Sequence, residues 1–425
     1  LRISHLCFQT LGSDLLLDMF IENSSLLDAL FYFLETVNRN STPEPSSAYF
    51  TRFVGALFEQ HPSEMMTYCK QHLRMIGNLV ENVHNSYLME ILYKLVDSNL
   101  THQRLMESQL FYSLAKILDE NEPIERQEDA TEVIMSVLTL CQPWGETAFV
   151  KELLNSSKTI TQILDYIKLR PMSQFRVQNG LKILVSALQL IGDDCADEPL
   201  LVTNLALHIE YFKELLQDLC KTDAPAVTVT FGEVKLFGFV RLGILELFLS
   251  LMCTGFPIVV DVMASNDVFS LLLDILFEYK WNNIVHHQVT KIFSCLLYCN
   301  NHEIMKSVIE KCNILDRIVE AHKVEMNTCG YLGHLRDLAN EMLSVADHSP
   351  PIAILMEQNA KWKEFATSVL QDWNDLECDD DSHDFDDDDD DIDIELCDPQ
   401  DFEDGEAYEE YEIDIDDAYD HEDDY

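Results

Sequence analysis

Two histidines and two cysteines at helical spacing are the first side chains in this sequence that could do chemistry. His286 and His287 precede Cys295 and Cys299, and imidazole nitrogens and thiolates are the ligands that zinc prefers. Adjacent side chains on a helix point about 100° apart, so the two histidines cannot face one metal ion. Both cysteines share a stripe with apolar residues. We therefore interpret all four side chains as structural and expect no bound metal.

A glycine-bearing loop, Gly330-Tyr331-Leu332-Gly333, is the second candidate for chemistry. A phosphate-binding turn would follow a strand and carry a further glycine, and this loop has neither, so we interpret it as a turn that begins a helix. The segment Phe231-Gly232-Glu233 likewise lacks the Gly-x-Ser-x-Gly context of a hydrolase nucleophile. No paired Ser, His and Asp stand out elsewhere, and the sequence predicts neither an enzyme nor a cofactor.

The C-terminal segment is the third candidate, because clustered carboxylates attract hard cations. Residues 375–425 contain 29 acidic residues and no Lys or Arg. They lack the spaced ligands and central glycine of a calcium loop, so we expect only weak, nonspecific ion association. So much charge cannot repay the entropy of folding by burial, which predicts a disordered tail. Aromatic residues among the acids are typical of a flexible ligand for basic protein surfaces: Phe385, Phe402, Tyr408, Tyr411 and Tyr419.

The overall charge balance limits the partners of the chain. The 425 residues carry a formal net charge of −48, and residues 1–374 account for −19 of it. Phosphate binding needs a basic footprint that neither part supplies, so we expect no nucleic acid partner. Because the sequence opens on Leu1 rather than Met, we expect residues to be missing at the N-terminus.

Cysteine usage and hydropathy predict the compartment. The 12 cysteines are scattered singly, mostly within apolar helical patterns, which favours reduced, buried thiols in a reducing intracellular compartment. The cytoplasm is the expected location, with the nucleus as a second option. The longest uncharged apolar run, Leu247–Val260, is interrupted by Gly255 and Pro257. It is shorter than the roughly 20 residues that cross a bilayer, so we expect no membrane insertion.

Helical periodicity recurs from Leu15 to Trp373, with prolines between the periodic segments. It predicts an all-α fold of stacked helical pairs, an armadillo- or HEAT-like α-solenoid, over residues 1–374. We expect single helices over Leu15–Val37, Leu105–Leu118 and Leu200–Lys221. Thr222–Gly232 reads as a linker, and only residues 227–231 within it alternate as a strand would.

The stretch Ser265–Tyr298 predicts a pair of antiparallel helices most sharply. The side chains of residues 265–267 offer oxygens that can cap the first helix, and the chain turns around at Trp281. We expect Asn282 to leave that helix in a left-handed conformation and Asn283 to cap the next one. Because both helices are amphipathic, the pair must be covered by neighbours, as in a stacked array.

The turn between these helices resembles a motif of the SAPS-domain family, the regulatory subunits of the protein phosphatase 6 class. The family has an aromatic-rich helix end, Tyr-x-Trp-Asn-Asn, an apolar pair, His and Gln-Val. This sequence carries the matching residues Tyr279, Trp281, Asn282, Asn283, His286, Gln288 and Val289.

Further blocks are similar to the family in the same order. Residues 312–321, CNILDRIVEA, resemble its "KCxLIERILEA" helix, and residues 330–340, GYLGHLRDLAN, resemble its "GYMGHLTRIAN" block. Trp362–Leu370 is similar to its final helix. The family usually has further residues before the position of Leu1, and the resemblance extends weakly back to Ser13-Asp14.

This resemblance implies a non-catalytic subunit that binds a phosphatase catalytic chain and directs it to substrates or to ankyrin-repeat partners. Loops on a rigid scaffold display binding residues without disturbing its core. We therefore expect partner-binding residues at the Trp281 turn and the Gly330 loop, with structural roles as the alternative for each: Tyr279, Trp281, Asn282, Asn283, His286, Gly330, Tyr331, Gly333, His334 and Arg336. The alternative functions are a helical-repeat transport receptor and an acidic chaperone for basic proteins.

Overall fold

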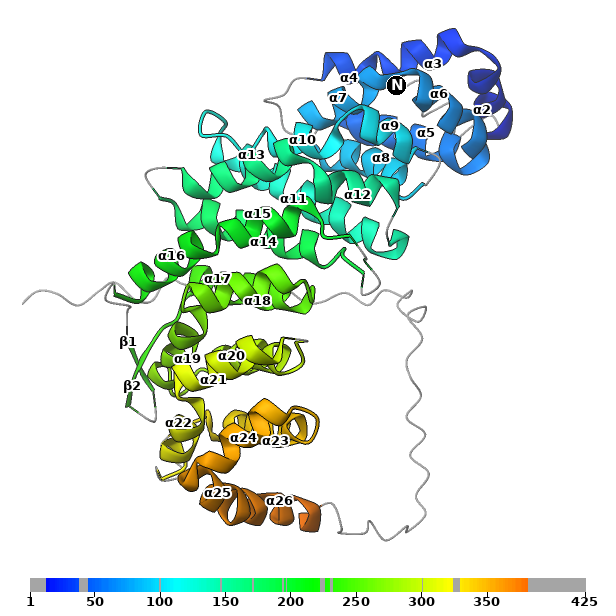
Figure 1. The fold of residues 1–425 in the computed structure, drawn as a ribbon. Helices are drawn as coiled ribbons and strands as arrows, with labels where there is room; N and C mark the ends of the chain where they lie inside the picture. The colour runs from blue at the N-terminus through cyan, green and yellow to red at the C-terminus, as the bar shows by residue number, and fades with distance from the viewer. Residues whose placement is uncertain are drawn as a thin grey trace, which may run out of the picture. The chain divides into compact units, whose positions relative to one another are not determined.

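The computed structural model describes residues 13–37, 45–98, 101–145, 147–169, 172–192, 195, 197–221, 226–229, 232–299, 301–323 and 329–380. The described part of the chain is mainly helical, and successive helices lie beside one another in a stack (Figure 1). The first helices are α2 (Ser13–Glu22), α3 (Ser24–Phe31), α4 (Phe33–Thr36), α5 (Pro45–Gln60), α6 (Pro62–Gln71), α7 (Leu73–Glu81), α8 (Ser86–Val96), α9 (His102–Glu107) and α10 (Leu110–Ala115).

The middle of the stack continues the same pattern with longer helices. It contains α11 (Ile124–Cys141), the short 3-10 helix η1 (Gln142–Trp144), α12 (Ala148–Asn155), α13 (Ser157–Lys168), α14 (Gln174–Leu188), α15 (Leu200–Leu207), α16 (Ile209–Lys221), α17 (Phe239–Cys253) and α18 (Pro257–Ser265). The last helices are α19 (Val268–Glu278), α20 (Asn283–Leu297), α21 (His302–Cys312), α22 (Ile314–Ala321), α23 (Leu332–Ala346), α24 (Pro350–Gln358), α25 (Ala360–Thr367) and α26 (Val369–Asp380).

Helix packing follows a period of three helices. One row runs through the stack because α5 contacts α8, α8 contacts α11, and the same step continues through α14, α17 and α20 to α23. A second row runs from α9 through α12, α15, α18 and α21 to α24. The predicted all-α solenoid is thus confirmed, and the helical pairs of the prediction are accompanied by a third helix, as in armadillo repeats.

Three of the predicted single helices are broken. Leu15–Val37 divides at Asn23, whose side chain accepts a hydrogen bond from Ser25 N at 3.2 Å and so begins α3. Leu105–Leu118 divides at Gln109, which has a positive φ of 52°. Leu200–Lys221 divides at His208 between α15 and α16. Apolar residues keep their helical spacing across each break, so the periodicity of the sequence predicted one helix where the structure has more than one.

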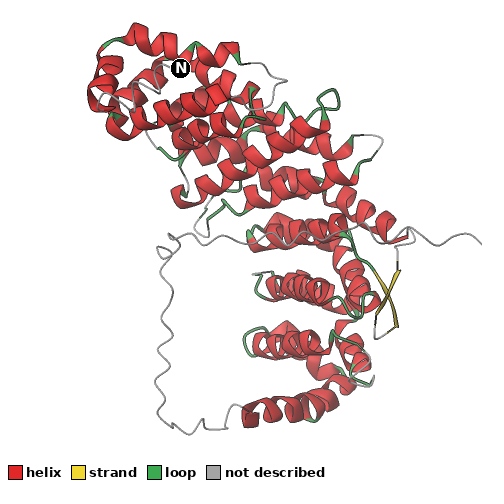
Figure 2. Cartoon of the chain, turned by 180° about the vertical axis from the view of Figure 1, so that it is seen from behind, coloured by secondary structure: helices red, strands yellow, loops and turns green. Residues whose placement is uncertain are grey.

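A single antiparallel β-hairpin interrupts the described helices and is the yellow element of Figure 2. Strand β1 (Ala226–Val229) pairs with β2 (Gly232–Lys235), with Ala226 opposite Lys235. The predicted linker Thr222–Gly232 therefore contains a strand where its residues alternate. Residues 234 and 235 belong to β2, and the next helix, α17, starts at Phe239.

Helix α26 continues past residue 374, where we expected the disordered tail to begin. The chain divides into two compact units, Leu1–Gln371 and Asp372–Tyr425, and the helix stack belongs to the first. In the second unit, residues 372–380 are described and are helical. Residues 375–380 were predicted to be disordered, but no proline or glycine separates them from the preceding helix. The rest of the predicted tail, 381–425, lies outside the described residues.

Within the described ranges, none of the helices is both long and apolar enough to cross a bilayer.

Candidate functional site

The turn between α19 and α20 is fixed by an asparagine cap. Asn282 has φ −96° and its side chain accepts a hydrogen bond from Val285 N at 3.2 Å. Asn282 is therefore the cap of α20, and Asn283 is its first residue. The predicted left-handed exit at Asn282 and the predicted cap at Asn283 are both wrong. The cause is that α19 ends three residues earlier, at Tyr279, whose φ is also negative.

The predicted caps of α19 do not act as caps. Ser265 Oγ donates to Asp261 O at 2.7 Å and Asn266 Nδ2 donates to Val262 O at 2.8 Å, because both residues end α18. Asp267 precedes α19 in a left-handed conformation and its carboxylate pairs with Lys311 of α21. The side chains that we assigned to one helix terminus thus finish the preceding helix or bridge to a later one.

A backbone hydrogen bond joins the Trp281 turn to the Gly330 loop. Gly330 N donates to Lys280 O at 2.8 Å. A Cβ added at Gly330 would lie 3.4 Å from Lys280 O and 3.6 Å from the Trp281 ring, so the loop packs directly against the turn. The two stretches that we selected from the sequence therefore form one joint, and the loop begins α23 as predicted. We call the residues 279–286 and 329–334 the turn–loop joint.

His286 lies at the centre of this joint and is fully buried. Its Nε2 donates to Tyr279 O at 2.8 Å, and its ring meets that of Tyr331 at 5.7 Å between centroids. Burial lowers the pKa of His286 to about 4, so the ring is neutral at physiological pH. Its Nδ1 has no hydrogen-bond partner among the described residues. His286 thus stabilises the turn and is not accessible to a partner.

Tyr279 is held by an arginine that the sequence did not suggest. Arg241, at the start of α17, is 7% exposed. It donates to the Tyr279 hydroxyl at 2.9 Å, to Leu219 O at 3.1 Å and to Leu236 O at 2.7 Å, and its Nε donates to Phe237 O. Arg241 stands in an apolar run, so only its tertiary contacts distinguish it from a surface arginine.

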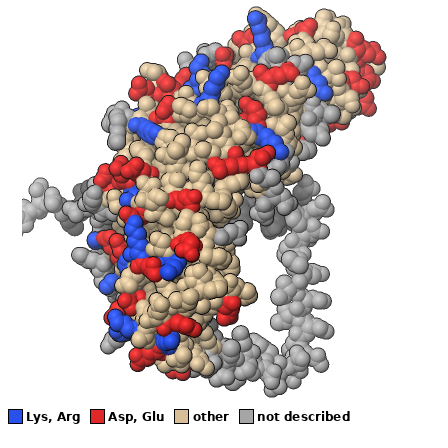
Figure 3. All heavy atoms as spheres, viewed as in Figure 1, with Lys and Arg blue, Asp and Glu red and all other residues tan. Residues whose placement is uncertain are grey.

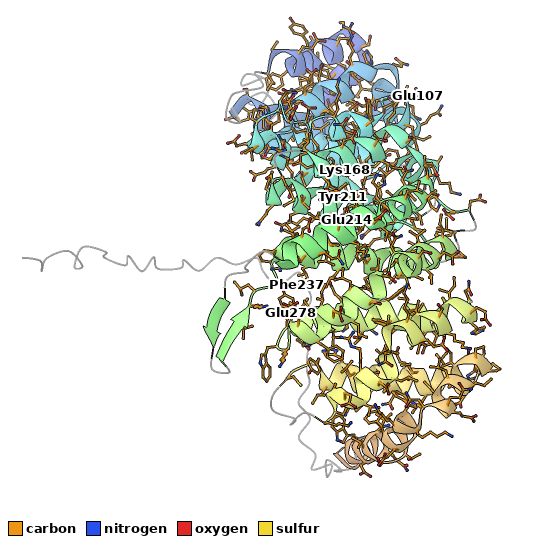
Figure 4. All side chains as sticks on the ribbon, turned by 60° about the vertical axis from the view of Figure 1, so that its left-hand side comes forward. Glu107, Lys168, Tyr211, Glu214, Phe237 and Glu278 are labelled. Carbon is orange, nitrogen blue, oxygen red and sulfur yellow. The ribbon has the colours of Figure 1, made fainter. Side chains whose placement is uncertain are left out.

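The hairpin base packs beside this arginine. The rings of Phe237 and Tyr279 meet edge to face at 4.8 Å, and Lys235 of β2 pairs with Glu278 at 2.8 Å. Figure 4 shows Phe237 and Glu278 next to each other where the hairpin meets the stack. The β-hairpin, α17 and α19 are thus connected next to the turn.

The exposed rim of the joint is formed by the first turns of α20 and α23. Asn283, Ile284 and His287 are exposed on α20, and Ile284 keeps 59% of its surface in solvent. His334 is half-buried on α23, and its Nε2 lies 2.5 Å from Asn283 Oδ1. Burial lowers the pKa of His334. We call Asn283, Ile284, His287 and His334 the rim.

The remaining predicted residues divide between rim and core. Tyr331 is buried, Trp281 and Arg336 are half-buried, and Gly330 and Gly333 are exposed. Arg336 lies 3.7 Å from the Asp337 carboxylate. The structure therefore brings the predicted residues together, but the aromatic ones face the interior. Ile284 and His287 complete the rim, and neither was among the residues that we expected to bind a partner.

In the described ranges, no three His, Cys, Asp or Glu side chains are grouped to hold a metal ion. Basic and acidic side chains are interspersed over the face shown in Figure 3, so no large basic patch is visible on it. What the joint offers is a rigid edge with one exposed aliphatic side chain among polar ones.

The stack of three-helix repeats defines a helical-repeat protein of the armadillo type. A family model described as SIT4 phosphatase-associated protein, SAPS, matches residues 54–379. The chain therefore belongs to the SAPS family. The turn–loop joint lies within the matched residues.

Curated relatives carry names that fit this family. The chain is 22% identical to the serine/threonine-protein phosphatase 6 regulatory subunit 3-A of Xenopus laevis, over 83% of this chain and 48% of the relative. It is 21% identical to regulatory subunit 2 of Mus musculus, over 83% and 47%. It is also 21% identical to extragenic suppressor of kinetochore protein 1 of Schizosaccharomyces pombe, over 61% and 35%. The chain thus spans about half the length of the curated relatives it matches.

Proposed function

We propose that this protein is a non-catalytic regulatory subunit that binds a phosphatase 6-type catalytic chain and directs it to substrates. The observation that carries the proposal is the SAPS match over residues 54–379, together with relatives named as regulatory subunits of that phosphatase. A stack of helical repeats suits the role because it displays a long surface without needing an active site.

We place part of the catalytic-chain interface on the rim. Binding energy at interfaces concentrates in a few side chains that become buried on association and that are surrounded by polar groups. Ile284 has this setting, since Asn283 and His287 flank it and His334 lies across from it. The hydrogen bond from Gly330 N to Lys280 O holds the two helix starts together, so little order is lost on binding.

A matched pair of substitutions tests this placement. Ile284 and Ile124 are 59% and 60% exposed, and each lies in the first turn of its helix. An aspartate there suits the positive end of the helix dipole, so neither variant should lose stability. We expect Ile284→Asp to reduce capture of purified phosphatase 6 catalytic chain at least tenfold, while Ile124→Asp captures it as the wild type does. Equal capture by both variants would remove Ile284 from the interface.

A double substitution tests the other side of the rim. His334→Ala with Arg336→Ala should weaken capture of the catalytic chain and leave the melting temperature near that of the wild type, because partly exposed polar side chains contribute little to stability. Undiminished capture by a stable double variant would move the interface to another surface. One such surface is the groove of about 760 Å³ between α11, α14 and α17, lined by Glu128, Glu132, Lys182 and Glu246.

The acidic segment is a second contact region in this proposal. Its 29 acidic residues steer basic surfaces of substrates or partners toward the chain by long-range attraction. Because the screening length is about 8 Å at physiological ionic strength, added salt should slow association more for the whole chain than for a deletion of residues 381–425. Identical salt dependences of the association rate would remove the segment from binding.

A further inference from the structure

A surface cavity beside the stack contains two thiols in contact. The cavity, of about 860 Å³, opens between the C-terminal end of α17, the start of α18 and the C-terminal half of α20. Its lining includes Cys253, Val260, Cys295, Tyr298 and Cys299. No residue of the turn–loop joint lines it, so the proposed catalytic-chain interface does not account for this grouping.

The two nearest thiols come from different helices that pack on each other. Cys253 Sγ on α17 lies 3.9 Å from Cys295 Sγ on α20, and both are free. A disulfide needs the sulfurs at about 2.05 Å, so the two side chains must move together from 3.9 Å, which rotation about the Cα–Cβ bonds can supply where the Cα atoms lie within about 7 Å. Cys253 is exposed, so a small reagent in the cavity can reach it.

The chemical state of Cys253 differs from that of the buried cysteines. The contact with the Cys295 thiol and the positive charge of Lys291 hold the pKa of the Cys253 thiol below its ordinary value. Burial instead raises the pKa of Cys69 and of Cys141 to about 12, so these remain protonated. The thiolate is the form that attacks peroxides and electrophiles. Cys253 is exposed, which corrects our expectation that the thiols within apolar helical patterns are buried.

We propose that Cys253 and Cys295 form a reversible disulfide on exposure to hydroperoxides. The Cys253 thiolate attacks one oxygen of hydrogen peroxide and becomes a sulfenic acid, while the O–O bond breaks and the other oxygen leaves as hydroxide, which takes up the proton that the Cys253 thiol released. Cys295 thiol then attacks the Cys253 sulfur, forming the S–S bond and releasing water. In total, two thiols are oxidised by one peroxide, which is reduced to two waters. A dithiol reductant reverses the reaction.

The expected consequence is a covalent link between neighbouring repeats. The helices α17 and α20 are consecutive members of the row that runs from α5 to α23, so the disulfide would fix two repeats against each other. Oxidation would also remove both thiols from the cavity lining. The site is thus a candidate for oxidative modification that acts on the scaffold, whichever partner the scaffold binds.

Peptide mapping of the whole protein tests the proposal. The reduced chain is treated with hydrogen peroxide, its remaining thiols are alkylated, and it is digested with trypsin without reductant. Tryptic peptide 242–280 contains Cys253 as its one cysteine, and peptide 292–306 contains Cys295 and Cys299. We expect these two peptides to be joined, with a mass two hydrogens below their sum, and to separate with dithiothreitol.

Single serine variants identify the partner. Cys299 lines the same cavity one helical turn from Cys295, so Cys299→Ser is the matched control and should retain the cross-linked peptide. Cys253→Ser and Cys295→Ser should lose it, with circular dichroism showing that each variant is folded. A cross-link that persists in Cys295→Ser would assign the bond to Cys299 and overturn the proposal. So would wild-type protein that stays unlinked while its Cys253 becomes oxidised.

Discussion

His72 in the N-terminal half and His286 in the C-terminal half each form a hydrogen bond with the backbone carbonyl of a tyrosine. His72 Nδ1 lies 2.8 Å from Tyr68 O, and its Nε2 lies 3.3 Å from the Asp28 carboxylate. The His72 side chain keeps 40% of its surface in solvent. His286 lies 2.8 Å from Tyr279 O but is fully buried. The same pair of residues thus occurs in two different environments.

The difference shows how one side chain type serves two purposes in a repeat protein. At His72 the polar atoms face solvent and a carboxylate, and Tyr68 donates to that same carboxylate at 2.9 Å. At His286 the described contacts are a carbonyl and aromatic rings, and the turn is closed from outside by Gly330. The buried cluster should therefore govern stability, whereas the exposed cluster should contribute little.

Replacement of Arg241 should lower the free energy of unfolding most, because its side chain donates to the Tyr279 hydroxyl in the buried cluster. Arg241→Met removes its hydrogen bonds to the Tyr279 hydroxyl and to three backbone carbonyls in a buried place, and we expect a loss of roughly 3 kcal/mol or more in unfolding free energy. Urea unfolding measures it. Arg126, which donates to Glu81 O at 3.0 Å near the surface, supplies the control, and Arg126→Met should cost about 1 kcal/mol. Equal losses of unfolding free energy in the two variants would contradict the difference expected between the buried arginine and the one near the surface.

The histidines themselves test the comparison directly. His286→Ala removes a fully buried ring and its hydrogen bond to Tyr279 O, so we expect a loss of roughly 2–3 kcal/mol. His72→Ala removes a side chain that is partly in solvent and should cost about 1 kcal/mol or less. The two variants are compared in the same urea titration. If His72→Ala proves the more damaging change, burial does not decide the ranking.

Acidification should weaken the fold through the buried ring. The pKa of His286 is about 4 in the folded state, below its ordinary value of 6.5, because burial disfavours the charged form. Between these two pH values the unfolded chain therefore carries a proton on this histidine that the folded chain does not. Stability is complete above about pH 6.5 and falls as the pH drops toward 4. Burial lowers the pKa of His322 and of His334 in the same direction.

The contribution of His286 can be separated from that of the other histidines. We expect His286→Asn to be less stable at pH 7 and to lose less additional stability between pH 6.5 and 4 than the wild type does. Thermal melting at a series of pH values gives both quantities. An unchanged acid-side slope in the variant would show that His286 does not carry this part of the pH dependence.

The smallest effect is expected at the exposed cluster. Asp28→Asn keeps the shape of the side chain that meets Tyr68 and His72 but removes its charge. Because Asp28 is more than half exposed, solvent screens the pair, and we expect a change of about 0.5 kcal/mol or less. Addition of 1 M NaCl to the wild type should leave this difference smaller still. A larger loss of unfolding free energy would show that the His72 cluster contributes as much to stability as the buried His286 cluster does.

Much of the fold could be predicted from periodicity, because long amphipathic helices have an unambiguous period. The predicted helical region from Leu15 to Trp373 includes α8 and α11, which are continuous over 11 and 18 residues. The breaks at Asn23, Gln109 and His208 were missed because none contains proline or glycine. A helix can end at such positions through a local cap or one unusual φ angle, which hydrophobic periodicity does not register.

The candidate site was predictable only in part. The motif resemblance identified the two stretches that meet, but the bond that joins them, from Gly330 N to Lys280 O, is tertiary and has no local signal. Ile284 follows Asn283 in an apolar pair, and only the packing of α20 shows that one member of the pair faces solvent. Arg241 and the contact between Cys253 and Cys295 were missed for the same reason, since both depend on which helices become neighbours.

The hydrogen bond from Gly330 N to Lys280 O also sets an order of assembly. In a linear array most contacts are local, so structure can spread outward from any repeat. Here the Gly330 amide finds its partner only after the turn between α19 and α20 has closed. The start of α23 is therefore completed on a finished neighbour. Exchange of this one amide with solvent deuterium would therefore report on the assembly of the last repeats. The exchange should be slow only while the turn between α19 and α20, the Gly330 loop and the start of α23 are packed together.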